Sequence, residues 1–151
     1  MKYDRVIVAG TFDRLHKGHE LLLETAFINT KNELIIGVTD EPMNKNKLYS
    51  ELIQPLTQRI KNVEEYIDSI QKNTSFKINI SIIIINDKYS VSIDDENLNA
   101  IVLSNETFES ANEINKIRIV KGLKPLVIIE IKRTLEISST ILRKQEYLYH
   151  I

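Results

Sequence analysis

The fold is decided by the stretch Gly10-Thr11-Phe12-Asp13-Arg14-Leu15-His16-Lys17-Gly18-His19. It directly follows an apolar run, residues 5–9, that is typical of a buried strand, and it leads into a helical pattern. A strand that ends in such a turn at the start of a helix presents backbone amides, and these favour anions. His16 and His19 are three residues apart, so both imidazoles can face the same ligand. The stretch therefore predicts a phosphate-binding site.

The residue types in this stretch suit chemistry on phosphate. Attack on an α-phosphorus builds negative charge on the phosphoryl oxygens, which imidazole N–H donors can stabilise. Thr11 can hydrogen-bond the attacking phosphate, and Gly18 lets the backbone approach the phosphates closely. Asp13 is expected to brace the turn or cap the helix. Two other interpretations are a pair of surface or cap histidines and a metal site, but no third histidine, cysteine or carboxylate cluster accompanies this pair.

Composition sets limits on the class of protein. The chain has 151 residues, of which 42% are hydrophobic and 27% are charged, as expected for one globular domain spanning residues 1–151. A formal net charge of −1 gives no case for binding nucleic acid or an anionic membrane. Cysteine is absent, which excludes disulfides and thiolate metal sites. The early polar residues and the short apolar runs predict neither a signal peptide nor a membrane span, and hence a cytoplasmic protein.

Strand-like and helix-like patterns alternate along the chain. The strand-like runs are almost continuous in Ile, Leu and Val, as parallel strands covered on both faces are. We therefore expect an α/β fold, a single Rossmann-like doubly wound domain with a five-stranded, mainly parallel sheet. Ligands of such sheets bind beyond the carboxyl ends of the strands, where Thr11, His16 and His19 would lie. The expected strands are residues 5–9, 33–38, 76–85, 100–103 and 126–131, and the expected helices are residues 19–27, a segment from Pro55 to about 70, and about 105–121, ended by Gly122.

A second group of polar residues lies near the end of the sequence. Ser138, Ser139 and Thr140 precede an apolar, basic turn and resemble the start of a helix. Their hydroxyls and amides would bind the β- and γ-phosphates of a nucleotide, with Arg143 one turn further on as a cationic clamp. A plain helix cap is the alternative.

Further candidates follow the second and fourth strands. Lys47, or else Lys45, could reach the phosphates, and Arg59 on the next helix could do the same unless it is an ordinary surface arginine. Ser104 ends the fourth strand, a position that suits adenine and ribose contacts. The remaining two candidates, Asn115 and Arg118, share one face of the following helix.

Taken together, these segments resemble the phosphopantetheine adenylyltransferase family in its archaeal and eukaryotic form, within the HxGH nucleotidylyltransferases. The first motif, GTFDRLHKGH at residues 10–19, and ISSTILR at residues 137–143 are similar to motifs of the whole superfamily. The more specific likeness lies in four segments: LIQPLTQR at 52–59, VLSNET at 102–107, EINKIR at 113–118 and KGLKPL at 121–126.

The resemblance implies transfer of AMP from ATP to 4′-phosphopantetheine, with Mg²⁺, giving dephospho-coenzyme A and pyrophosphate. It also implies that His19 is the main transition-state stabiliser with His16 beside it, and that no residue of the protein acts as a nucleophile. Thr11, Lys47 and Arg59 would position the acceptor. The nucleotide would contact Gly10, Phe12, Gly18, Ser104, Asn115, Arg118, Ser138, Ser139, Thr140 and Arg143. No residue is assigned to a metal.

Two alternatives to this interpretation belong to different classes. A cytidylyltransferase acting on a small polyol phosphate shares the first motif, and Arg133-Thr134 before Ile137 faintly resembles part of its last motif. A nucleotide-binding protein without catalysis would be expected to lack one of the motifs, yet all are present. The expected partners are small molecules, with neither nucleic acid nor membrane, and the chain is expected to be a monomer or a small homo-oligomer.

Overall fold

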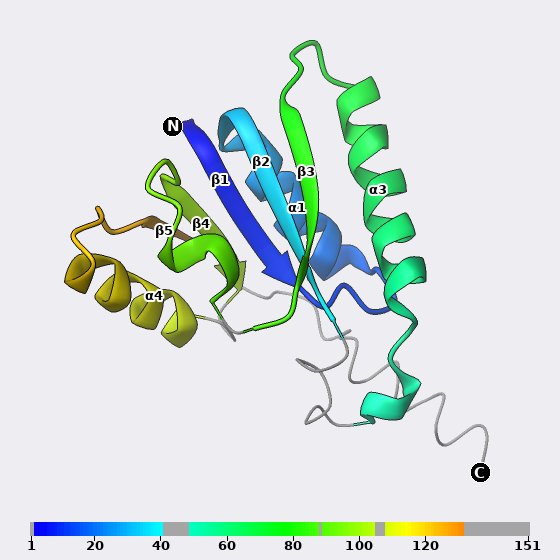
Figure 1. The fold of residues 1–151 in the computed structure, drawn as a ribbon. Coiled ribbons are helices and arrows are strands. Elements are labelled where there is room, and N and C mark those ends of the chain that lie inside the picture. Colours follow the sequence, from blue (N-terminus) through cyan, green and yellow to red (C-terminus); the bar gives the residue numbers. More distant parts are fainter. Residues whose placement is uncertain (1, 41–48, 88, 105–107, 132–151) are drawn as a thin grey trace.

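The computed structural model describes residues 2–40, 49–87, 89–104 and 108–131, and these build one five-stranded sheet (Figure 1). The strand order is β3-β2-β1-β4-β5, and every adjacent pair is parallel. This confirms the prediction of a five-stranded parallel sheet. The strands are β1 (Tyr3–Gly10), β2 (Thr30–Thr39), β3 (Asn79–Ile85), β4 (Ala100–Ser104) and β5 (Val127–Ile131).

Within the described ranges, three α-helices connect the strands: α1 (Lys17–Ile28), α3 (Leu56–Lys72) and α4 (Phe108–Val120). Two short 3-10 helices, η1 (Ser50–Leu52) and η2 (Ser90–Ile93), precede α3 and β4. Pro55, expected at the first helical position, lies one residue earlier as the cap of α3, where its missing N–H costs nothing. Gly122 ends α4 as predicted, since its φ of +81° is a backbone conformation that favours glycine.

Successive residues of a strand point to opposite faces of the sheet. Helices cover both faces, and each face has its own apolar cluster. Val8 of β1 and Ile36 of β2 pack with α1 and α3, whereas Ile7 and Ile35 belong to a second cluster with α4. Figure 1 shows α4 and η2 on the opposite side of the sheet from α1. This is the doubly wound arrangement that the near-continuous apolar runs indicate.

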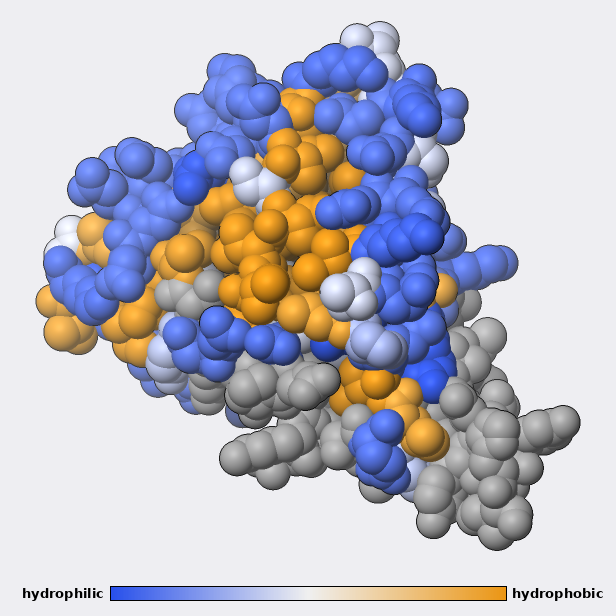
Figure 2. All heavy atoms as spheres, turned by 45° about the vertical axis from the view of Figure 1, so that its right-hand side comes forward, coloured by the Kyte–Doolittle hydropathy of each residue, from blue (hydrophilic) through white to orange (hydrophobic). Residues whose placement is uncertain are grey.

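The strand β3 forms one edge of the sheet. Its sequence, NISIIII, contains no charged residue, and Ile84 is 50% exposed. Figure 2, turned to bring this side forward, shows an apolar area flanked by hydrophilic residues. In the part of the chain that the structure describes, no helix is long and apolar enough to cross a membrane.

The parallel order brings the carboxyl ends of all five strands to the same edge of the sheet. Thr11 directly follows β1, Thr39 ends β2 and Ser104 ends β4. Because β1 pairs with both β2 and β4, these three residues end neighbouring strands. The β1–α1 loop rises from the middle of this edge, at the point where the strand order reverses.

Candidate active site

The loop between β1 and α1 has an unusual backbone. Phe12 and Arg14 have φ angles of +53° and +49°, in the left-handed region that residues other than glycine enter at a cost. These two residues lie within three residues of each other, shortly before α1 begins at Lys17. The Phe12 side chain is completely buried and packs in the core, and contact between Phe12 and a nucleotide stays a prediction. Gly10 lies under the Phe12 ring, where a Cβ would be 3.4 Å from the ring edge.

Asp13 braces this loop, as the sequence predicts. Its side chain is completely buried, and its carboxylate accepts hydrogen bonds from Arg14 Nη1 at 2.8 and 3.0 Å and from the Gln54 amide at 2.8 Å. The Arg14 amide in turn donates to Gln54 Oε1 at 3.0 Å. These bonds fix the loop to the segment that leads into α3, so the strained backbone is held from outside.

The two histidines of the motif cap helix α1. His16 is the residue before the first turn, and its Nδ1 accepts the Gly18 amide at 3.0 Å. His19 reaches back, and its Nδ1 accepts the His16 amide at 3.3 Å. This is a capping box in which histidines replace the usual Ser and Glu. A Cβ on Gly18 would lie 2.9 Å from His16 Cε1, so only glycine allows this imidazole its place.

The capping bonds decide which nitrogen of each ring carries the proton. In a neutral imidazole one nitrogen accepts and the other donates. Since Nδ1 accepts a backbone amide in both rings, the hydrogen-bond geometry assigns the proton to Nε2 in both. The rings are stacked, with centroids 3.9 Å apart and planes inclined by 20°. The start of α1 therefore carries two neighbouring imidazoles of fixed orientation with the proton on Nε2, a donor type that suits an anionic transition state.

Thr11 and Arg59 meet below the histidines. The Thr39 hydroxyl donates to the Thr11 hydroxyl at 3.1 Å, which joins the ends of β1 and β2. Arg59 is completely buried, and it donates to the carbonyl oxygens of Thr11, Thr39 and Gln54 at 2.9, 2.7 and 2.8 Å. The sequence suggests that Arg59 touches the acceptor. In the structure, Nε and Nη1 of Arg59 donate to main-chain carbonyls, and contact between Arg59 and the acceptor stays a prediction.

Asn115 and Arg118 require a correction. The Asn115 amide donates to the Leu126 carbonyl at 3.0 Å and accepts the Leu126 N–H at 2.7 Å. Arg118 is completely buried and donates to four carbonyl oxygens, those of Ser92, Asp95, Leu98 and Lys124. Burial lowers the pKa of this guanidinium, and the Asp95 carboxylate opposes that effect.

The positions of these acceptors explain the correction. Leu98 lies just before β4, and Leu126 just before β5. Asn115 and Arg118 therefore act at the amino ends of the strands, on the far side of the sheet from His19. They cannot serve a nucleotide bound at the carboxyl edge.

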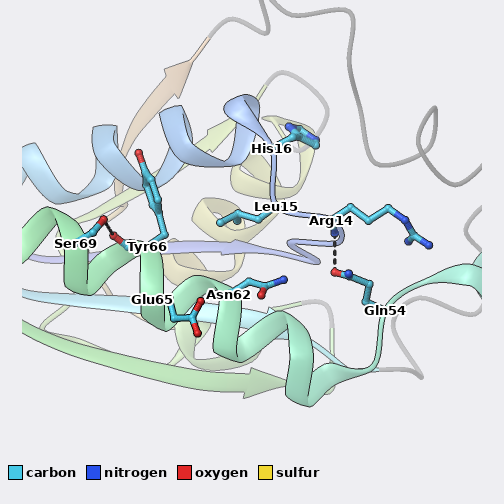
Figure 3. Close-up of a pocket in the computed structure, with 8 residues that line it drawn as sticks. All are labelled: Arg14, Leu15, His16, Gln54, Asn62, Glu65, Tyr66 and Ser69. Carbon is cyan, nitrogen blue, oxygen red and sulfur yellow. Dashed lines mark hydrogen bonds between the residues drawn. The ribbon is translucent and has the colours of Figure 1, made fainter.

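An open depression of about 650 Å³ lies beside the histidines. Figure 3 shows that Arg14, Leu15 and His16 line one side and that residues of α3 line the other. Sequence reasoning did not find these α3 residues, because they lie on the hydrophilic face of an ordinary amphipathic helix. The lining residues outside the loop are Gln54, Asn62, Glu65, Tyr66 and Ser69.

Tyr66 joins α3 to α1 next to this depression. Its hydroxyl donates to Glu24 at 2.6 Å. Burial, together with the Glu24 carboxylate, raises the pKa of Tyr66, so the phenol keeps its proton at any pH near neutral. This bond joins α1 and α3 beside the depression.

Several predicted residues lie outside the described part of the chain. These are Lys45 and Lys47 after β2 and the four residues of the last motif, Ser138, Ser139, Thr140 and Arg143. Ser104 is described and lies at the carboxyl end of β4, where the sequence places it. For Ser104 and for these six residues, contact with a ligand stays a prediction.

The fold and the paired histidines define the class, a doubly wound α/β protein with a histidine-capped helix at the carboxyl edge of a parallel sheet. Residues 7–145 match the model of the cytidylyltransferase-like family, and the chain belongs to that family. A crystal structure of a protein of unknown function from Archaeoglobus fulgidus has the same fold, with a TM-score of 0.74 and 28% identity. That comparison covers 91% of this chain and 94% of the other.

Curated relatives narrow the family further. The phosphopantetheine adenylyltransferase of Thermococcus kodakarensis is 40% identical over 130 residues, covering 86% of this chain and 75% of that protein. The enzyme of the same name from Methanothermobacter thermautotrophicus is 39% identical over 150 residues, covering 96% and 86%. The chain is thus a member of the phosphopantetheine adenylyltransferase group, as the motifs at residues 102–126 suggest.

Proposed function

We propose that this protein transfers AMP from ATP to 4′-phosphopantetheine, forming dephospho-coenzyme A and pyrophosphate. The observation that carries the proposal is the pair of Nε2–H donors at the start of α1. They lie at the edge of the sheet where doubly wound folds bind nucleotides. The similarity to adenylyltransferases along most of the chain supports the choice of both substrates.

The reaction requires positioning and charge stabilisation rather than a protein nucleophile. An oxygen of the acceptor phosphate attacks the α-phosphorus of ATP, and a new P–O bond forms as the bond to pyrophosphate breaks. Negative charge on the transferring group would be stabilised by the Nε2–H groups of His19 and His16. The Thr11 hydroxyl, at the end of β1, would hold the acceptor phosphate in line.

Ser104 at the end of β4 and residues outside the described ranges complete this proposal. Lys47, in preference to Lys45, would neutralise the acceptor phosphate, and Ser104 would contact the adenosine. The ATP phosphates would be held by Ser138, Ser139, Thr140 and Arg143. If this assignment is right, Lys47→Ala lowers turnover more than Lys45→Ala does, and the reverse order would move the role to Lys45.

Magnesium belongs to the proposal as a companion of ATP. In the described ranges, no group of three His, Cys, Asp or Glu side chains could hold a metal ion. Mg²⁺ in nucleotide enzymes is commonly held by substrate phosphates and water with few protein ligands, so the residues present are compatible with it. When bound, it would neutralise the charge of the phosphates.

The test is pyrophosphate release with ATP and Mg²⁺, with and without 4′-phosphopantetheine. Release that requires both substrates is the expected result. A parallel reaction with CTP and glycerol 3-phosphate tests the cytidylyltransferase alternative. Release there and none with ATP would keep the family and reject the proposed substrates, and no release in any mixture would reject catalysis.

A further inference from the structure

The guanidinium of Arg59 joins Thr11 and Thr39, the two residues just beyond the ladder between β1 and β2. The last paired residues in the ladder between these strands are Gly10 and Val38. The next pair in the same register would be Thr11 and Thr39, whose carbonyls lie beyond the regular strand hydrogen bonds. Nη1 of Arg59 bonds both of these carbonyls, at 2.9 and 2.7 Å. The two hydroxyls also meet, at 3.1 Å.

A third bond from the same guanidinium reaches the start of α3. Nε of Arg59 donates to the Gln54 carbonyl at 2.8 Å. Gln54 is itself bonded to Asp13 and Arg14 of the β1–α1 loop. Arg59 therefore links three segments that are distant in sequence: the end of β1, the end of β2 and the segment before α3. Its side chain is completely buried, so these bonds are shielded from water.

We propose that Arg59 is a positioning residue that fixes Thr11 and Thr39 as one unit and thereby sets the affinity for the phosphate of the acceptor. The inference rests on the proposed function, in which Thr11 holds that phosphate. A guanidinium suits the task because its planar fork presents N–H donors in fixed directions, whereas a lysine ammonium is a point charge on a flexible chain. Without the fork, the two strand ends can shift against each other.

The structure offers a matched control for the test. Arg118 is also completely buried and also bonds main-chain carbonyls, but it does so at the amino ends of the strands. Arg59→Lys and Arg118→Lys therefore remove the same chemical group from two similar environments. A general loss of stability should occur in both variants, whereas a loss of acceptor positioning should occur in only one.

The experiment measures KM for 4′-phosphopantetheine, KM for ATP and kcat at a temperature where circular dichroism shows each variant to be folded. In Arg59→Lys we expect KM for 4′-phosphopantetheine to rise by roughly tenfold, since small displacements of positioning groups carry large penalties. KM for ATP should change by less than about twofold, because Thr11 and Thr39 are assigned here to the acceptor phosphate rather than to ATP. In Arg118→Lys both KM values should stay within about twofold of the wild type.

A second variant keeps the proposal testable if Arg59→Lys does not fold. Thr39→Val removes the hydroxyl bond to Thr11 and leaves Arg59 in place, and it should raise KM for 4′-phosphopantetheine by about threefold. A wild-type KM in folded Arg59→Lys would overturn the proposal, as would an equal rise in Arg118→Lys. If Arg59→Lys does not fold, a wild-type KM in Thr39→Val would also overturn it.

The wild type separates this failure from that of the proposed function. If the wild-type protein does not release pyrophosphate with ATP and 4′-phosphopantetheine, the proposed function has failed and the inference fails with it. If the wild type is active and the KM for the acceptor does not respond to Arg59, only the positioning role is rejected. Isothermal titration of 4′-phosphopantetheine into wild type and Arg59→Lys provides a readout independent of turnover.

Discussion

Two polar segments of this protein are similar in sequence but differ in the hydrogen bonds that their side chains make. Residues 10–19 and residues 115–126 both combine cationic or amide side chains with a glycine, and both suggest nucleotide contacts. In the first segment the capping bonds use Nδ1 of each imidazole, so the proton of each ring is assigned to Nε2. In the second, the side chains of Asn115 and Arg118 bond the carbonyls and amide of nearby loops.

The comparison shows that a polar motif indicates a binding site only where its side chains keep hydrogen-bonding groups that the backbone does not use. Buried carbonyls require donors, and a side chain that supplies several of them has a structural role. Arg118 supplies donors to four carbonyls, and Asn115 pairs with both polar groups of Leu126 as a neighbouring strand would. The two segments should therefore respond differently to mutation, one in stability and the other in turnover.

The largest effect is expected at the structural segment. Arg118→Met leaves several buried carbonyls without a donor, which should lower the free energy of unfolding by about 4 kcal/mol. Turnover per folded molecule should stay within about twofold of the wild type. Chemical denaturation and activity at low temperature measure the two quantities. Lys121→Met is the control, because it removes an exposed ion pair with Asp94 and should cost less than about 1 kcal/mol.

The next effect should appear at the motif. His19→Ala removes one Nε2–H donor and should lower kcat about 100-fold. The loss of its capping bond should lower the free energy of unfolding by only about 1 kcal/mol. Steady-state kinetics and thermal unfolding separate the two. Turnover at the wild-type level would remove His19 from the proposed mechanism and erase the contrast with Arg118.

A smaller effect should come from the glycines of the two segments. Gly18→Ala places a methyl group 2.9 Å from His16 Cε1, so the imidazole must move, and kcat should fall about tenfold. Gly122→Ala adds a methyl group with no heavy atom within 4 Å but at a φ of +81°, which should cost about 1 kcal/mol of stability. Equal kinetic losses in the two variants would contradict the division between the segments.

The smallest effect should be that of Asn115→Ala. It removes two hydrogen bonds to Leu126 at a half-buried position, and it should lower the free energy of unfolding by about 1 kcal/mol. Kinetic constants should not change. A rise in KM for ATP, measured in the same pyrophosphate assay, would restore the original prediction that Asn115 contacts the nucleotide.

Much of the fold could be predicted from the sequence because its strands are short, apolar and clearly separated. The run at residues 100–103 matches β4 to within one residue, and the run at residues 5–9 lies inside β1, which extends from Tyr3 to Gly10. The third strand begins at Asn79 rather than Phe76, because Phe76 stacks on Phe27 with ring centroids 5.3 Å apart. Apolarity alone does not distinguish a strand residue from a loop residue that is anchored in the core.

The candidate site was harder to predict, because a sequence pattern does not show at which edge of the sheet a helix residue lies. Helix α4 begins near the carboxyl end of β4 and runs back toward its amino end. At 1.5 Å per residue, Asn115 lies roughly 10 Å along that path and Arg118 roughly 15 Å. This count would have removed both from the nucleotide site. The burial of Arg59 and Phe12 depends on tertiary packing, which the pattern at residues 10–19 does not contain.

The strand order has a consequence for how the chain is made. Of the five strands of the sheet, β1 leaves the ribosome first and occupies the centre of the sheet, whereas its neighbour on one side, β4, is synthesised about 100 residues later. Residues 3–85 can assemble three strands while the other edge of β1 has no partner. The apolar middle of the nascent protein therefore stays open until residues 100–104 emerge.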